Sequence, residues 1–297
     1  MQKQIKLLTI GNSFANNSTR YLQDLVDADP SVSLVLGKAN LGGCSLQRHW
    51  RHVAAYEANP EDPQGSPYRG KSLNEILHEQ DWDIITIQQV SMQSSERESY
   101  YPYAENLIRY VQKHSPESEI RIHMTWAYRS DDPRFRKGDD SQGKMYADLK
   151  KNYWTIAAEH NLKIIPVGKA FQVARSHPYW QYRPDPDYNF DSPPYLKLPD
   201  QSYSLCAGYY WRKKKDLDEY YLTMDGHHAN EYGQYLGACV FFECMYAKSV
   251  LNNPFVPEEI DKEDAAFLQR IAHQTVSQTP ETQNPPDVKA VDSISIP

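Results

Sequence analysis

Short apolar runs alternate with helical patterns up to about residue 176, and this alternation constrains the fold more than any other feature of the sequence. The runs are rich in Ile, Leu and Val, and segments with the apolar spacing of a helix separate them. Strands joined through helices need crossover connections, which build a parallel sheet covered on both faces. We therefore predict a flavodoxin-like three-layer α/β/α sandwich with a parallel five-stranded sheet. The predicted strands cover residues 4–10, 31–37, 83–88, 119–125 and 162–167.

Two later segments break this rhythm. Residues 178–222 are rich in proline and aromatic residues, which indicates a structured insertion rather than a plain connector. The last residues, 276–297, are polar and proline-bearing, and are expected to form an extended or mobile tail. We interpret residues 1–275 as one domain that carries the insertion. The aromatic residues of the insertion are Tyr179, Trp180, Tyr182, Tyr188, Phe190, Tyr195, Tyr203, Tyr209, Tyr210, Trp211, Tyr220 and Tyr221.

The charge balance argues against a nucleic-acid partner. The 297 residues contain 32 Lys and Arg against 39 Asp and Glu, which gives a formal net charge of −7, whereas a nucleic-acid surface needs a clustered basic excess. No run is long enough to predict a transmembrane helix, so no membrane partner is expected. The chain as given reads as soluble and cytoplasmic, or as periplasmic or secreted if a signal peptide has been removed. The sequence leaves the oligomeric state open.

A serine follows the first predicted strand. Gly11-Asn12-Ser13-Phe14 lies between that strand and the apolar side of a helix over residues 19–27. Gly, Asn and Ser are ordinary turn residues. The same place is also the carboxyl edge of a sheet, where open α/β folds bind ligands. Ser13 is therefore a candidate nucleophile.

A second motif precedes the helix that begins near Tyr232. Asp225 and His228, separated by Gly226 and His227, are expected on the loop before that helix. This spacing lets the carboxylate hold one imidazole nitrogen while the other serves as a base for a serine. The alternative is that Asp225 and Gly226 only make a turn, which the histidines cap.

Taken together, the Gly-Asn-Ser block and the Asp-x-x-His block resemble those of the SGNH, or GDSL-type, hydrolases, over most of residues 4–250. Asn12 stands where these proteins usually have an acid. The resemblance implies a triad of Ser13, His228 and Asp225 that works without a cofactor or a metal. It is strongest to a bacterial branch of the superfamily whose substrates it leaves open.

The resemblance also implies an oxyanion hole. Besides the amide of Ser13, a glycine after the second strand is expected to donate its backbone N–H. Gly43 is the prediction, with Gly42 as the alternative. The usual Gly-x-Asn-Asp block is replaced by residues 87–91, IQQVS, so a glutamine amide is expected to substitute for the asparagine. Gln89 is the prediction, and Gln88 is the alternative.

An esterase that removes O-acetyl groups from carbohydrate is the function that these features favour. Aromatic rings of the insertion would stack on sugar, and Asn12, Trp126, Trp180 and Trp211 are the candidate substrate contacts. A weakly active SGNH fold that binds glycan is one alternative. A metal-dependent hydrolase is another, because the sequence contains the His49-x-x-His52 and His227-His228 pairs, but hydrogen-bonded or solvated histidines explain those pairs better.

Overall fold

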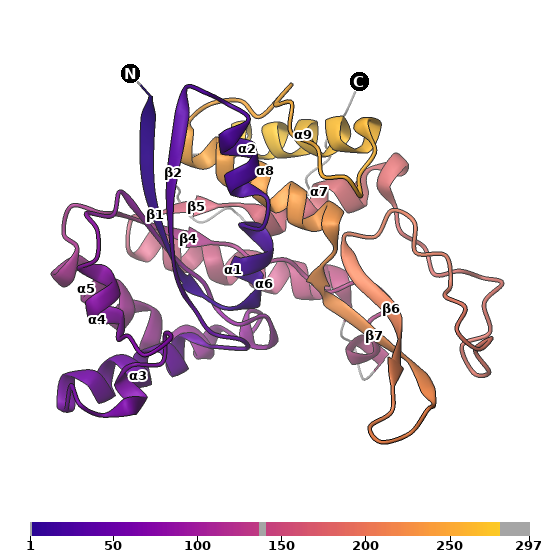
Figure 1. Cartoon of the computed structure of the whole chain (residues 1–297), viewed down its shortest axis with the longest axis horizontal. Helices are drawn as coiled ribbons and strands as arrows, with labels where there is room; N and C mark the ends of the chain where they lie inside the picture. The colour runs from indigo at the N-terminus through magenta and orange to yellow at the C-terminus, as the bar shows by residue number, and fades with distance from the viewer. Residues whose placement is uncertain (1, 137–140, 280–297) are drawn as a thin grey trace.

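The computed structural model describes residues 2–136 and 141–279. Its centre is a five-stranded sheet in the order β2-β1-β3-β4-β5, and every neighbouring pair is parallel (Figure 1). This is the strand order of flavodoxin-like folds, so the predicted fold class is confirmed. The strands are β1 Lys3–Gly11, β2 Val32–Asn40, β3 Ile84–Ile87, β4 Glu119–His123 and β5 Lys163–Ile165.

Helices cover both faces of the sheet, because each parallel connection has to cross over it. One layer contains α1, α2, α7 and α8, with α9 packed outside against α7 and α8, and the other contains α3 to α6 (Figure 1). Their bounds are α1 Ser13–Ser18, α2 Leu22–Asp27, α3 Leu46–Ala58, α4 Leu73–Leu77, α5 Tyr103–His114, α6 Gln142–Glu159, α7 Val167–Ser176, α8 Glu231–Tyr246 and α9 Lys262–Ser277. Within the described residues, no helix has the length and apolar character needed to cross a membrane.

The core explains why the central strands read as continuous apolar runs. β3 is buried along its whole length, and most of β1 is buried too, as expected for strands covered on both faces. Helix α8 is apolar on almost all sides because it lies under α1, α2, α7 and α9. Its Gly237 allows α1 to approach, since a Cβ there would lie 2.9 Å from the Cα of Ser18. The close contact fixes α1 against the core.

The insertion ends in a two-stranded antiparallel hairpin that stands apart from the main sheet. Its strands are β6 Cys206–Lys213 and β7 Tyr220–Ala229, and the hairpin projects beside the carboxyl edge of the sheet (Figure 1). Gly208 adopts φ +79 at an irregularity in the pairing, a backbone conformation that favours glycine. Of the predicted tail, residues 276 and 277 close α9, and residues 280–297 lie outside the described part of the chain.

Candidate active site

Ser13 begins α1 directly after β1. Asn12 caps this helix, because its Oδ1 accepts a hydrogen bond from Phe14 N at 3.0 Å. The first N–H groups of a helix have no partner within the helix, and in the described part of the chain the N–H of Ser13 donates to no protein oxygen. A partly exposed hydroxyl and a free N–H therefore lie together at the carboxyl edge of the sheet.

Asp225 and His228 lie on β7 rather than on the predicted loop. They occupy the last residues of that strand, and Asp225 pairs with Gly208 of β6. The expectation of a loop was wrong because pairing with β6 extends the strand almost to α8. Asp225 Oδ1 accepts hydrogen bonds from the backbone N–H groups of His227 and His228, at 3.2 and 2.9 Å.

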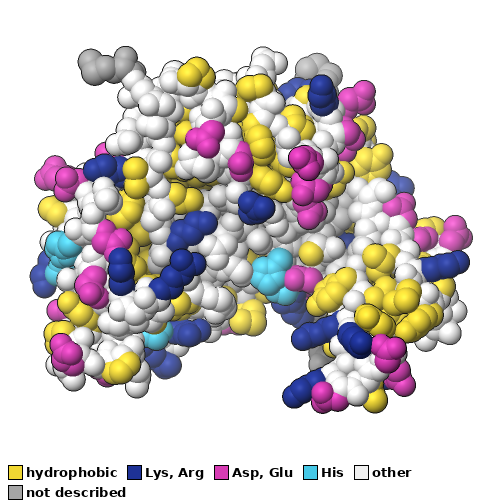
Figure 2. All heavy atoms as spheres, viewed as in Figure 1, with side chains coloured by type: hydrophobic (Ala, Val, Ile, Leu, Met, Phe, Trp, Pro, Cys, Tyr) yellow, Lys and Arg dark blue, Asp and Glu magenta, His cyan; other side chains and the backbone are white. Residues whose placement is uncertain are grey.

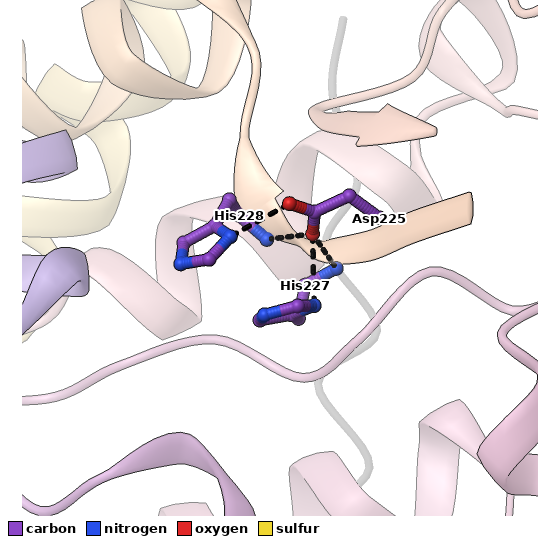
Figure 3. Close-up of side chains that lie close together, drawn as sticks. All are labelled: Asp225, His227 and His228. Carbon is purple, nitrogen blue, oxygen red and sulfur yellow. Dashed lines mark hydrogen bonds and ion pairs between the residues drawn. The ribbon is translucent and has the colours of Figure 1, made fainter. Parts of the chain in front are cut away.

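One chain of hydrogen bonds joins the two motifs. His228 Nδ1 lies 2.7 Å from Asp225 Oδ2 (Figure 3), and His228 Nε2 lies 2.8 Å from Ser13 Oγ. The structure thus brings together Ser13, His228 and Asp225, which are far apart in the sequence. All three residues are half-buried, and Figure 2 shows histidine side chains at the base of a notch beside the hairpin.

Asp225 is held as a carboxylate. Partial burial alone would raise the pKa of Asp225, but contacts with the His227 and His228 imidazoles and the His228 N–H outweigh it and lower this pKa far below the ordinary value of 3.8. An ionised Asp225 accepts a hydrogen bond from His228 Nδ1. His228 Nε2 is then the acceptor that faces the serine. This is the arrangement that general-base activation of a hydroxyl needs.

His227 shares the same carboxylate. Its Nδ1 lies 2.8 Å from Asp225 Oδ1 (Figure 3), an electrostatic contact that lacks the alignment of a hydrogen bond. The His227 ring also contacts the rings of Phe14 and Tyr128. Potential ligand atoms of His227, His228 and Asp225 lie within 4.8 Å of one another, so a metal ion would find donors here. It would have to compete with the bonds of His228 to Asp225 and Ser13.

His49 and His52 do not join this cluster. His49 is fully buried, with Nδ1 2.7 Å from the Tyr68 hydroxyl and Nε2 3.0 Å from Gly11 O. Burial lowers the pKa of His49 to about 4, so its ring is neutral. His52 contacts Gln64 O. Both histidines support the scaffold, as the hydrogen-bonded reading predicted.

Trp126 packs in the core against the end of β7 and has no exposed surface with which to contact substrate. It is fully buried between Phe14 and Phe171, at ring distances of 4.2 and 4.4 Å. Its Nε1 donates to His227 O at 2.9 Å, and Arg129 N donates to the neighbouring Gly226 O at 2.8 Å. The predicted substrate contact is therefore replaced by a role in holding the end of β7.

Gly42 and Gly43 form an open turn beside Ser13. Leu41 N donates to Gly11 O at 3.0 Å, which ties the turn to the end of β1. Gly43 has φ +60, and a Cβ on either glycine would contact nothing within 4 Å. In the described residues the N–H groups of both glycines donate to no protein acceptor. Both remain candidates for the oxyanion hole, together with the N–H of Ser13.

The predicted oxyanion role of Gln89 does not agree with its surroundings. Gln89 is fully buried, and its Nε2 donates to the carbonyl and hydroxyl oxygens of Ser99, both at 3.0 Å. Its Oε1 accepts from the N–H groups of Leu46 and Val90. Because both amide hydrogens are used, this side chain fastens the β3 end to α3 instead of facing an oxyanion.

Asn12 and Gln88 belong to a buried polar network. Asn12 Nδ2 donates to Cys44 O at 3.0 Å, and Gln88 Nε2 donates to Asn12 Oδ1 at 2.9 Å. The buried Asn12 side chain thus has partners at both its amide nitrogen and its amide oxygen, which argues against the predicted substrate contact for it, and Gln88 Nε2 has a partner as well. The network connects the nucleophile turn to the glycine turn.

His123, at the end of β4, completes this network and was not predicted. Its Nδ1 lies 2.7 Å from Gln88 Oε1, and its Nε2 lies 3.1 Å from Ser18 Oγ. Burial lowers the pKa of His123 to about 3, so the ring is neutral. A single histidine within an apolar strand gives no sequence signal, but a polar residue at the carboxyl end of a central strand could have drawn attention to it.

The aromatic insertion divides into two clusters. Trp180 is buried and packs against Tyr203, Tyr232 and Phe267 of α9, so its predicted substrate contact is wrong. Trp211 instead lines an open hollow of about 1030 Å³ between the hairpin and the preceding loops. Other residues of this hollow are Asp131, Asp132, Phe190, Tyr195, Tyr209, Tyr220, Tyr221 and Met224.

The comparisons with known proteins agree with this fold. A crystal structure of a DUF4886 family protein from Bacteroides uniformis ATCC 8492 is similar, with 26% identity, a TM-score of 0.68, and coverage of 94% of this chain and 98% of that chain. A protein from Slackia heliotrinireducens, described as a proposed SGNH hydrolase, superposes with a TM-score of 0.51 at 19% identity, over 82% of this chain and 100% of that chain. The expected SGNH resemblance is thereby confirmed as a likeness of fold.

A match to a sequence family assigns this chain to that family. None of the curated proteins matches this sequence significantly. Residues 6–191 and 209–275 match the family described as Domain of unknown function (DUF4886). The matched residues include both blocks that carry the hydroxyl, imidazole and carboxylate of the candidate site, and they make up most of the chain. This protein therefore belongs to the DUF4886 family.

Proposed function

We propose that the protein is a serine hydrolase that cleaves esters through an acyl-enzyme. The observation that carries this proposal is the continuous contact from Asp225 Oδ2 to His228 Nδ1 and from His228 Nε2 to Ser13 Oγ, at 2.7 and 2.8 Å. The likeness to SGNH hydrolase folds supports it. Ser249, His273 and Glu243 also bring a hydroxyl, an imidazole and a carboxylate together, but both contacts are made by the same ring atom, His273 Nδ1.

The reaction follows from these positions. His228 Nε2 takes the Ser13 proton as Oγ bonds to the ester carbonyl carbon, and the N–H groups of Ser13 and Gly43 receive the oxyanion. Collapse breaks the bond to the alcohol, which receives the proton from His228. Water then attacks the acyl-enzyme while His228 takes its proton, and the bond to Ser13 Oγ breaks as His228 returns this proton to Oγ and the acid is released.

Carbohydrate is the proposed alcohol part of the ester, and an acetyl group is the proposed acyl part. The hollow lined by Trp211 extends along β7 as far as Met224, the residue before Asp225. Aromatic rings with carboxylates between them suit sugars, whose apolar faces stack on rings and whose hydroxyls donate to oxygen. A glycan could therefore occupy the hollow while its ester lies at Ser13.

Covalent labelling tests the serine mechanism. A fluorophosphonate should label the protein, with the modified peptide mapping to Ser13, and turnover of p-nitrophenyl acetate should persist after dialysis against EDTA, because the proposed steps need no metal. Loss of turnover on dialysis, with recovery on adding a divalent ion, would instead support the metal-dependent alternative. Glycan binding without labelling or turnover would support the binding-protein alternative.

The two tryptophans of the insertion give a matched test of the hollow. Trp211→Ala should lower kcat/KM for an acetylated oligosaccharide by about tenfold and change turnover of p-nitrophenyl acetate little, since remote binding energy acts only on the larger substrate. Trp180→Ala should lower the melting temperature and affect both substrates alike, because Trp180 is core. If Trp211→Ala lowered kcat/KM equally for both substrates, the proposal that the hollow binds the glycan would be contradicted.

A further inference from the structure

Four cationic side chains surround the end of β2, next to the glycine turn. Thr9 pairs with Lys38 and Gly11 pairs with Asn40, so Lys38 lies beside the end of β1 that leads to Ser13. Arg48, in the first turn of α3, reaches the carbonyl oxygen of Gly42 at 3.5 Å. The turn that forms the proposed oxyanion hole is therefore adjacent to a guanidinium group.

The other two cations lie on either side of Lys38. Arg20 follows α1, and Arg69 follows Tyr68, whose hydroxyl is bonded to His49 of α3. Burial, followed by the charges of Arg20 and Arg69, lowers the pKa of Lys38. These cationic groups are thus close enough to repel one another, which is unfavourable unless an anion joins them.

This cationic cluster consists of Arg20, Lys38, Arg48 and Arg69, of which Arg20 shares the surroundings of Tyr21 with acidic side chains. In residues 2–136 and 141–279, none of the four forms an ion pair with Asp or Glu. Figure 2 shows Lys and Arg side chains gathered over the region of β1, β2 and α1, beside the histidine at the base of the notch. In a chain of net charge −7, a concentration of unpaired cations at this place needs a reason beyond solubility.

We propose that the cationic cluster binds a carboxylate on the sugar of the substrate, so that the protein acts on acylated acidic glycans. This inference rests on the proposed ester hydrolysis and adds the charge of the substrate to it. Figure 2 shows the Lys and Arg side chains over β1 and β2 on one side of the notch and the hairpin that lines the hollow on the other, so one glycan could engage both. Positive charge beside the site would also speed the encounter with an anionic substrate.

Two acetylated glycosides that differ only at C6 test the inference. The wild type should show kcat/KM about tenfold higher for an O-acetylated methyl glucuronoside than for the matching glucoside at low salt, and about 0.5 M NaCl should reduce the preference because it screens exposed charges. Lys38→Gln, Arg48→Gln and Arg69→Gln should each reduce the ratio about threefold. Arg20 is left unchanged because it shares the surroundings of Tyr21 with acidic side chains.

The control removes a charge elsewhere. Lys113 lies in the last turn of α5, a helix that runs antiparallel to the strands and so ends at the opposite edge of the sheet. Lys113→Gln should leave the ratio unchanged. A wild-type ratio near one, or a ratio that none of the three substitutions lowers, would overturn the inference while leaving ester hydrolysis intact.

Equilibrium binding separates this inference from the proposed function. Ser13→Ala should bind the glucuronoside about tenfold more tightly than the glucoside in calorimetry, since the cationic cluster does not depend on the hydroxyl. Equal dissociation constants would contradict the inference even if neither glycoside is hydrolysed by the wild type. Turnover that survives in Ser13→Ala would contradict the proposed function instead.

Discussion

Ser13→Ala is expected to lower kcat for p-nitrophenyl acetate by about 10⁵-fold, because the hydroxyl is the proposed nucleophile and no other group can accept the acyl chain. His228→Ala should cost about as much. The two changes together should cost little more than either one, since residues that act as a unit are not additive. Steady-state kinetics of the two single variants and the double variant measure this directly.

His227→Ala is the control for this series. His227 neighbours His228 and contacts the same carboxylate, but it has no contact with Ser13. Its replacement should retain most of the activity, so the comparison distinguishes a base from a neighbouring imidazole. A Ser13→Ala variant that keeps more than about 1% of kcat would contradict the serine mechanism.

Asn12→Asp is expected to destabilise the protein by about 3 kcal/mol at pH 7, although an acid at this position is usual in SGNH proteins. Asn12 Nδ2 donates to the carbonyl oxygen of Cys44 at 3.0 Å in a buried place. An ionised aspartate would place a carboxylate oxygen against that carbonyl oxygen, which is repulsive in a buried place. The folded protein should therefore hold this carboxyl protonated, with a pKa above the unfolded value.

The destabilisation caused by Asn12→Asp should depend on pH. A carboxyl group whose pKa is raised by folding destabilises the protein only as pH rises above the unfolded pKa, about 3.9. The variant should approach the stability of the wild type near pH 4 and fall behind it towards pH 7, as measured by denaturant unfolding. Asn16→Asp is the matched control, because Asn16 is exposed and its Oδ1 only accepts a bond, from Asn40. A loss in Asn12→Asp that does not change between these pH values would contradict the argument.

The sequence predicted the features that depend on local order. Five apolar runs and their helical connections determine the sheet, and the Asp225-x-x-His228 spacing places an imidazole beside a carboxylate. That Ser13 meets His228 followed from the family resemblance rather than from any local pattern. The predictions that were wrong depended on burial and on hydrogen-bond partners. Gln89 and Trp180 have suitable residue types for a site, but the Gln89 amide bonds to the scaffold and the Trp180 ring packs in the core.

The hairpin was missed for a different reason. Among the described strands β6 pairs only with β7, and its residues alternate poorly between buried and exposed positions. A strand of this kind is specified by its partner rather than by its own pattern. Helix α3 was also missed, because arginines and histidines interrupt its apolar face while His49 is buried by bonds to Tyr68 and Gly11.

The candidate active site is complete only when the hairpin is docked on the body that carries the parallel sheet. Ser13 belongs to the parallel sheet layer and His228 to a separate two-stranded unit, and the two meet only where β7 docks. The hydrogen bonds that dock the hairpin include Trp126 Nε1 to His227 O, Arg129 N to Gly226 O, Ala229 N to Asn17 Oδ1 and Arg175 Nη2 to Cys206 Sγ. Partial opening of this seam would separate base from nucleophile while the sheet stays folded. Turnover therefore reports whether the hairpin is docked. On gentle heating, activity should be lost at a lower temperature than helical structure.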